Sequence, residues 1–502
     1  MKPRIQLSRL LGTAAVLAAV SSLASPAHAQ PAGAVGTTIT VNSLADGNLI
    51  VFPGDPYPCT LRDAILAANT NKAVHGCAAG MAPHFVSASP LKIDFIDRIV
   101  FDVGKGTPRI KLTKALPAIT EEVTIDGATG GATRIEIAGG QVPSFFSPGA
   151  TGILVTGTYS TLKSLVINGF RGHGIALTHD DGDGLVVVTP AQPERPQPGP
   201  GTLPGDPCGP QAFPADPSQC PPGGGPNDGV DTIGGLSGGG NTVLDCLIGT
   251  DASGTMAVPN GDGTPATAGI AILSPGNTVG GTASGARNVI SGNRGFGVLF
   301  DGVNNHVIGN LIGTGVTTNL ILGNLLDGVF VAGGQYATAS GEIRDNTIAN
   351  NGYNGVDAGY NDVSVLYSSL SNGRAIYGNG GLGIERGEAG VDAYDSSGRR
   401  NRPPNYPILQ ASTASLTGGT TIFGQISQLS PPGPITLQFF YNLSCDPTGY
   451  GEGWSYIGST TVASGAPTLF QFQTRSLFLK GFFTATATTA NGTSEFSACL
   501  GY

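Results

Sequence analysis

The sequence has little charge and few aromatic side chains. Of its 502 residues, 12% are charged, 7% are aromatic and one is tryptophan. Acidic residues outnumber basic ones, which gives a net charge of −9. Nucleic acids and anionic membranes attract basic surfaces, so this balance argues against both as partners. Solubility alone is enough to explain the acidic surplus.

Long hydrophobic runs are missing after residue 29, and none approaches the roughly 20 residues that a membrane-spanning helix needs. We therefore expect no transmembrane segment. The start of the chain is different, because basic residues precede an apolar stretch, Leu10–Leu23, and a small-x-small site follows at Ala27–Ala29. This pattern predicts a signal peptide over residues 1–29 and an exported protein, secreted or at the cell surface.

Glycine is abundant, with 79 residues, but it shows no three-residue period, which excludes collagen. In Asn288–Thr314, short aliphatic runs alternate with Gly and Asn, and no run is long enough for a helix. The segments Asn241–Thr250 (NTVLDCLIGT) and Asn305–Thr314 (NHVIGNLIGT) share six of ten positions and start 64 residues apart. We interpret this offset as three coils of about 21 residues.

Such a chain predicts an all-β fold, a parallel β-helix in which each short strand pairs with its counterpart one coil on. Aliphatic side chains should stack inside. Asparagine side chains at the bends should hydrogen-bond to the next coil.

The segment Cys59–Asn69, CTLRDAILAAN, resembles the Cys-Ser-Leu-Arg-Glu-Ala motif of a family of secreted bacterial right-handed parallel β-helix proteins. Thr60 and Asp63 replace the Ser and Glu of that motif. CDPTGYGEG and TSEFSAC, near the C-terminus, resemble parts of the Ig-like domain that follows the β-helix in the same family. The resemblance implies a pectin-lyase-like solenoid and export, but it implies little about activity.

The chain divides into four parts. After the signal peptide, residues 30–90 should hold a strand and a short helix, begun by a Thr60–Asp63 capping box, that covers the first coil. Residues 91–408 should form the β-helix, interrupted by a Pro/Gly-rich insertion at 189–240. Residues 409–502 should form a small β-sandwich with the tryptophan in its core. Arg62 should pair locally.

Seven cysteines in an exported chain permit disulfides. Proximity in sequence suggests the pairs Cys59–Cys77, Cys208–Cys220 and Cys445–Cys499. Cys246 is left over, at the repeat position that Asn310 occupies in the later copy. We interpret it as a buried small hydrophobe in preference to a reactive thiol.

Catalytic candidates come from three motifs that match polygalacturonase motifs: Gly172-His173-Gly174, Asp180-Asp181 and Arg109-Ile110-Lys111. Their order along the chain differs from that of polygalacturonases. Gly-x-Gly is also the ordinary bend of this repeat, as in Gly295-Phe296-Gly297. We favour the bend, and keep His173, Asp180 and Asp181 as catalytic candidates.

Two loops could bind ligands. Asp180, Asp181 and Asp183 could offer oxygen ligands to Ca²⁺, although their spacing differs from the EF-hand pattern and one loop supplies too few ligands. Phe145 and Phe146 could stack on a sugar ring, and packing against a neighbouring coil is the alternative that we favour. Zinc-ligand spacing, a P-loop and a dinucleotide fingerprint are missing, so Ca²⁺ is the only cofactor we consider and none is required.

Two functions remain open. The first is a monomeric binding protein, adhesin-like or structural, that holds polysaccharide or a surface partner without turnover. The second is a polysaccharide lyase or glycoside hydrolase acting on an extracellular acidic glycan. Charged side chains from several coils that converge in one groove would distinguish the second from the first.

Overall fold

The computed structural model describes residues 35–47, 56–82, 96–140, 142, 150–178, 238–332, 339–368, 374–399 and 403–502. Across these residues the fold is β throughout, apart from one helix, α1 (Leu61–Thr70). In this part of the chain, no helix is long and apolar enough to cross a membrane. The signal peptide and nearly all of the 189–240 insertion lie outside it and remain predictions.

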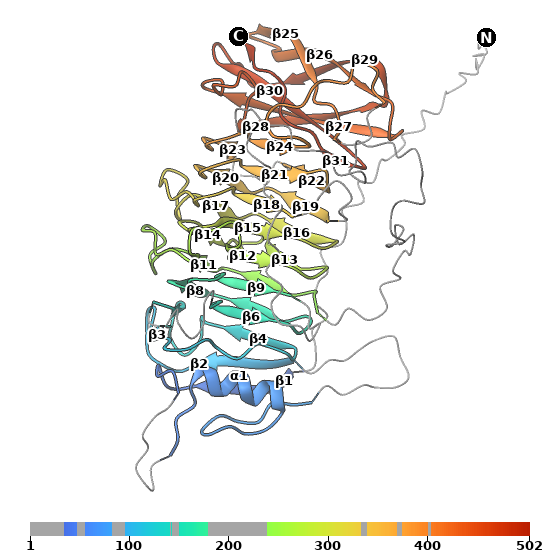
Figure 1. Ribbon diagram of the computed structural model, residues 1–502. Coiled ribbons are helices and arrows are strands. Elements are labelled where there is room, and N and C mark those ends of the chain that lie inside the picture. The colour runs from blue at the N-terminus through green and yellow to red at the C-terminus, as the bar shows by residue number, and fades with distance from the viewer. Residues whose placement is uncertain are drawn as a thin grey trace, which may run out of the picture.

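Three large sheets build the first part of the fold (Figure 1). The nine-stranded sheet contains β1 (Val35–Val41), β2 (Ile96–Phe101), β4 (Val123–Asp126), β7 (Thr161–Lys163), β10 (Thr242–Leu244), β13 (Thr278–Gly280), β16 (Asn305–Ile308), β19 (Ser340–Arg344) and β22 (Asp362–Leu366). The seven-stranded sheet contains β6 (Ile153–Val155), β9 (Ile175–Leu177), β12 (Ala268–Ile272), β15 (Phe296–Phe300), β18 (Val329–Val331), β21 (Val356–Gly359) and β24 (Ile384–Arg386).

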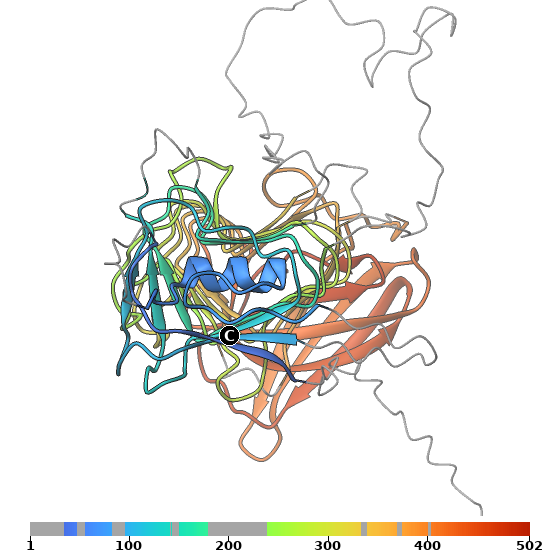
Figure 2. The same cartoon turned by 90° about the horizontal axis from the view of Figure 1, so that it is seen from below.

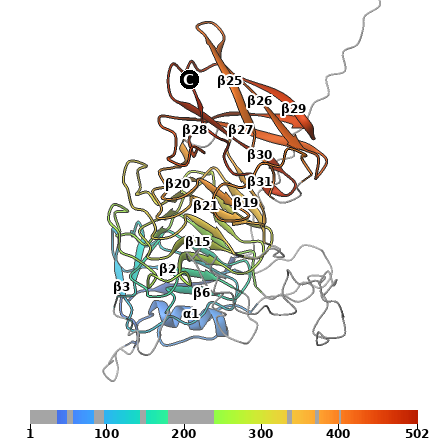
Figure 3. The ribbon, with the colours of Figure 1, turned by 45° about the horizontal axis from the view of Figure 1, so that its top comes forward.

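The third sheet has thirteen strands and runs through the whole molecule. Its parallel part contains β3 (Arg109–Lys111), β5 (Ile135–Ala138), β8 (Leu165–Asn168), β11 (Leu247–Ile248), β14 (Val289–Ile290), β17 (Leu311–Ile312), β20 (Thr347–Ala349) and β23 (Arg374–Tyr377). Its antiparallel part contains β28 (Gly453–Ala463), β27 (Pro434–Asn442), β30 (Phe482–Thr489), β31 (Gly492–Thr493) and β32 (Leu500–Gly501). A three-stranded sheet of β25 (Ile408–Ser415), β26 (Gly419–Gln428) and β29 (Gly465–Thr474) faces that antiparallel part (Figure 3).

From β10 to β24, the chain visits the three large sheets in turn, and each strand up to β21 pairs in parallel with the strand three places later. This arrangement is compatible with the predicted β-helix. The predicted coil length is wrong, however, because Asn241 and Asn305 are two coils apart, in steps of 36 and 28 residues. The 36-residue coil is the longer of the two because it carries a hairpin, closed by the Thr250–Ala257 bridge.

Inside the coils, side chains of one kind stack in register. One column in the seven-stranded sheet is aliphatic throughout: Ile153, Ile175, Ile270, Val298, Val329, Val356 and Ile384. Burial of each such side chain stabilises the fold by roughly 1.5–3 kcal/mol. These residues belong to one core that extends from Ile39 to Phe496.

Two further columns explain why the repeat uses Gly and Asn. Gly297 faces the interior, where a Cβ would lie 2.5 Å from the carbonyl oxygen of Gly328 one coil on. Asn293, Asn324, Asn351 and Asn379 form a ladder, in which the Oδ1 of each of the last three accepts the backbone N–H of the ladder residue one coil before it at 3.1–3.2 Å. The predicted hydrogen bonds between coils are therefore confirmed.

The helix α1 lies across the open end of the coils (Figure 2). Thr60 is its N-cap, and the Oγ1 of Thr60 accepts the N–H of Asp63, as the capping box predicts. Local pairing of Arg62 is wrong: its guanidinium binds Asp46 and donates to the carbonyl oxygen of Lys114 at 2.9 Å. Arg62 thus fastens the helix to the loop after β1 and to the loop after β3.

Two of the three suggested disulfides are present, Cys59–Cys77 and Cys445–Cys499. Cys246 is a buried free thiol, and its N–H donates to Asn288 Oδ1 at 2.8 Å. Asn288, Asn310 and Asn346 continue this series of hydrogen bonds as a second asparagine ladder. Cys246 therefore occupies an asparagine position of that second ladder. Cys208 and Cys220 lie outside the described residues.

Candidate functional site

His173 lies inside the stack of coils. Its Nδ1 accepts the backbone N–H of Ala268 at 3.1 Å, and burial, opposed by the charge of Asp262, lowers its pKa to about 4. Asp327 and Asn354 accept equivalent hydrogen bonds in later coils, where their Oδ1 atoms accept the backbone N–H groups of Asn354 and Leu382 respectively. His173 is therefore one of several polar side chains that join successive coils.

The other candidates from sequence cannot be placed beside it. Asp180, Asp181, Asp183, Phe145 and Phe146 lie outside the described residues. The catalytic set, the Ca²⁺ loop and the aromatic loop therefore remain predictions. Arg109, from the third polygalacturonase-like motif, lies on β3 with its Nε 3.5 Å from Glu136.

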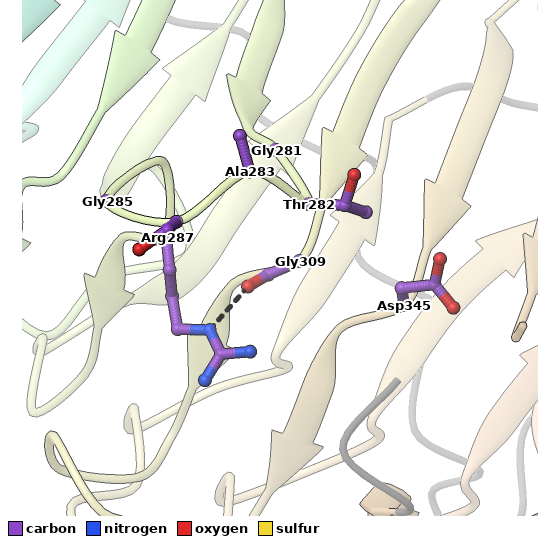
Figure 4. Close-up of a pocket in the computed structure, with 8 residues that line it drawn as sticks. Gly281, Thr282, Ala283, Gly285, Arg287, Gly309 and Asp345 are labelled. Carbon is purple, nitrogen blue, oxygen red and sulfur yellow. Dashed lines mark hydrogen bonds between the residues drawn. The ribbon is translucent and has the colours of Figure 1, made fainter. Parts of the chain in front are cut away.

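A surface hollow of about 310 Å³ opens at the corner between the nine- and thirteen-stranded sheets (Figure 4). Arg287 and Asp345 lie on opposite sides of Gly309, and the loop Gly281–Gly285 forms the rim. The Nε of Arg287 donates to the carbonyl oxygen of Gly309 at 2.9 Å. Gly309 adopts a φ of +70° and has no side chain to fill the space. The volume is at the lower end of the range of small-molecule sites.

One coil beyond Asp345 lies an arginine–aromatic cluster, formed by Arg374, Tyr377 and Trp454. The guanidinium carbon of Arg374 is 5.6 Å from the ring centroid of Tyr377 and 5.1 Å from that of Trp454. All three side chains are partly exposed. The prediction that the tryptophan lies in the sandwich core is wrong, because Trp454 lies on the surface where β28 pairs with β23.

The hairpin of an earlier coil supports this cluster. Tyr377 Oη donates to the carbonyl oxygen of Thr318 at 3.3 Å, and Arg374 Nη2 donates to Asn319 Oδ1 at 3.4 Å. No carboxylate lies within ion-pair distance of Arg374 in the part of the chain that the structure describes. A cation held against two rings in this way is stabilised by roughly 0.5–2 kcal/mol per ring.

The hollow and the cluster lie at the start of neighbouring strands. Asp345 precedes β20 and Arg374 begins β23, which is the neighbouring strand. Thr347 Oγ1 donates to the carbonyl oxygen of Arg374 at 3.4 Å, which links the two strands at this corner. This corner therefore offers a hydrophilic depression, a cation and two aromatic rings over successive coils.

A set of buried carboxyls lies elsewhere, on the seven-stranded sheet. Burial, helped by the charge of Asp357, raises the pKa of Asp327 to about 7, and burial raises the pKa of Asp357 to about 6. Glu385 is the register partner of Asp357, and burial raises its pKa to about 9. The stacked rings of Phe296 and Phe330 adjoin them, since Phe330 is the register partner of Asp357 on the other side. Separated carboxyl pKa values suit general acid and base roles.

Sequence reasoning missed the arginine–aromatic cluster. The one sequence feature that points to this cluster is that Trp454 is the only tryptophan in the chain. However, the alternation of apolar and polar side chains within a strand does not show which strand it pairs with. That pairing decides whether Trp454 faces a core or solvent.

Neither a scan against protein-family models nor a search of curated proteins found a match to this chain. Its own geometry is the basis for the function proposed below.

Proposed function

We propose that this chain is an exported right-handed parallel β-helix protein that binds an extracellular polysaccharide without turnover. The corner that carries the hollow and the arginine–aromatic cluster is the binding surface. Export is supported by the signal-peptide pattern and by the two disulfides, which persist in oxidising compartments. The right hand follows from the preference of parallel strand crossovers.

The observation that carries the proposal is the position of Arg374 against Tyr377 and Trp454 at the surface. Aromatic rings present flat apolar faces, on which the C–H face of a sugar can stack, with polar edges that remain wet. The guanidinium offers several planar N–H donors to ring hydroxyls or to a carboxylate.

The hollow adds a second contact on the same surface. Arg287 and the Gly281–Gly285 rim could contact the hydroxyls of a sugar ring, whereas the Asp345 carboxylate is buried and accepts the N–H of Ser368 at 2.6 Å and its Oγ–H at 3.0 Å (Figure 4). A polysaccharide that spans the hollow and the cluster would gain affinity from two linked, individually weak contacts.

The experiment measures co-sedimentation of the mature protein with insoluble acidic and neutral polysaccharides. We expect Trp454→Ala and Tyr377→Ala to lower the bound fraction at least several-fold. Tyr353→Ala is the matched control, because Tyr353 is 58% exposed on another part of the coils and should leave binding unchanged. Equal losses in all three variants, or binding by none of the proteins, would refute the assignment.

The alternative function is a glycoside hydrolase or polysaccharide lyase that acts on an acidic glycan. The specific observation in its favour is the separation of the Asp327 and Glu385 pKa values on the sheet that also carries the Phe296–Phe330 stack. Release of reducing ends or unsaturated products would be measured with and without Ca²⁺. Sustained release that is lost in Asp327→Asn, or in variants of His173, Asp180 or Asp181, would make this function correct.

A further inference from the structure

The C-terminal sandwich leaves a long β edge open. The antiparallel strand β28 pairs with β27 along its length, but β23 covers its other side only at Gly453 and Ser455. After Ser464 the chain continues as β29, which pairs only with β26. Across the described residues, no strand therefore covers the outer edge of residues 457–474.

This edge carries little of the usual protection. Natural edge strands are blunted by charged residues, especially Lys, or by Pro. Residues 457–474 read IGSTTVASGAPTLFQFQT and contain no charged residue, and Pro467 is the only residue without a backbone N–H. The strands β25 and β26 of the same sheet also contain no charge.

The outward side chains of β29 also suit a contact. Leu469 is 73% exposed, and Gln471 and Gln473 lie on the same exposed side of the strand. A β29 strand of ten residues is about 33 Å long, which is enough for a sizeable ladder of backbone hydrogen bonds.

Electrostatic repulsion is low at this end of the molecule. Residues 408–502 contain two basic residues, Arg475 and Lys480, and three acidic residues, Asp446, Glu452 and Glu495. Their net charge is −1, whereas the whole chain carries −9, so most of the repulsion between two copies would arise from residues outside this part.

We propose that two copies of this chain associate by antiparallel pairing of their β29 edges. A two-fold axis through β29 places residue i opposite residue j and residue j opposite residue i, so a charge near the axis would lie close to its own copy. A charge-free strand avoids that penalty, which favours a second copy over an unrelated partner. The inference revises the monomer expected from the sequence, and it is independent of glycan binding.

The test uses the mature protein in sedimentation-velocity runs over a wide concentration range. We expect a monomer–dimer equilibrium for the wild type and a monomer for Leu469→Lys, which places two like charges on the shared edge. Leu479→Lys is the matched control, because Leu479 is also 73% exposed but lies in the loop after β29. It should dimerise as the wild type does, and circular dichroism should show that both variants are folded.

Three outcomes would overturn the proposal. The first is a wild type that stays monomeric throughout. The second is a dimer that persists in Leu469→Lys and also in Gln471→Lys. The third is equal disruption by Leu469→Lys and Leu479→Lys, which would place the contact away from the edge.

Discussion

The carboxylate of Glu452 completes the asparagine ladder at Asn379. Its Oε1 accepts both the backbone N–H and the side-chain Nδ2 of Asn379, each at 3.0 Å, and its Oε2 accepts the N–H of Gly378. Glu452 comes just before β28, so the sandwich supplies the acceptor that the next coil would have supplied. The C-terminal part is therefore an end cap that continues the coils.

Replacement of Glu452 should destabilise the whole chain. Glu452→Ala leaves partly buried N–H donors of Gly378 and Asn379 without an acceptor, so we expect the free energy of unfolding to fall by about 1–3 kcal/mol. Glu452→Gln retains one acceptor oxygen and should cost less. Urea denaturation followed by circular dichroism measures both. If Glu452→Ala were as stable as the wild type, the end-cap role would be wrong.

The inward glycine column predicts a second stability effect. In Gly297→Ala, the new Cβ would meet Gly328 O at 2.5 Å and Asn324 Nδ2 at 2.7 Å, so neighbouring coils must shift. We expect a loss of about 1–3 kcal/mol, the usual cost of overpacking. Gly140→Ala is the control, because nothing lies within 4 Å of its added Cβ. Equal melting temperatures for the two variants would contradict tight stacking at this column.

The buried carboxyls make stability depend on pH. Burial raises the pKa of Asp327 and of Glu495 to about 7 and that of Glu385 to about 9, from unfolded values near 4. The native state thus holds more protons, so this contribution is full below about pH 4 and is lost as pH rises through 7 to 9. Denaturation midpoints should fall from pH 6 to pH 9, and the decline should be shallower in Glu385→Gln. A midpoint that rises over this interval would contradict the burial of these carboxyls.

Cys246 should be inert in the folded protein. Burial raises its pKa to about 12, and its Sγ lies 3.1 Å from the carbonyl oxygen of Leu244. We expect no alkylation by iodoacetamide at pH 8 until the chain is unfolded, when peptide mapping should find the label on Cys246. Labelling of the native protein at Cys246 would contradict its place in the ladder.

The sequence predicted the coiled pattern because Gly and Asn are each required at a position where little else fits. The Asn241 and Asn305 segments look alike for that reason, and the hydrogen bonds of Asn277 and Asn305 show it directly. Coil length was not predictable, because a hairpin such as Thr250–Ala257 lengthens one coil to 36 residues while the next coil has 28.

The candidate site was not predictable for a different reason. Arg374, Tyr377 and Trp454 meet through one antiparallel pairing, Arg374 with Ser455, between segments about eighty residues apart in sequence. Local sequence patterns determine the side-chain alternation of a strand but not which strand it pairs with. The same limit explains Arg62, whose contacts lie at Asp46 and Lys114 in place of its own helix.

Trp454 provides the most direct measurement of the proposed function, because it is the only tryptophan in the chain and lies in the proposed binding surface. The mature protein would be titrated with soluble acidic and neutral polysaccharides while tryptophan emission and its quenching by acrylamide are recorded. Binding at the cluster predicts a saturable change in emission and reduced quenching for at least one polysaccharide, without release of reducing ends or unsaturated products. Polysaccharide binding that leaves both Trp454 signals unchanged, or product release during the titration, would contradict it.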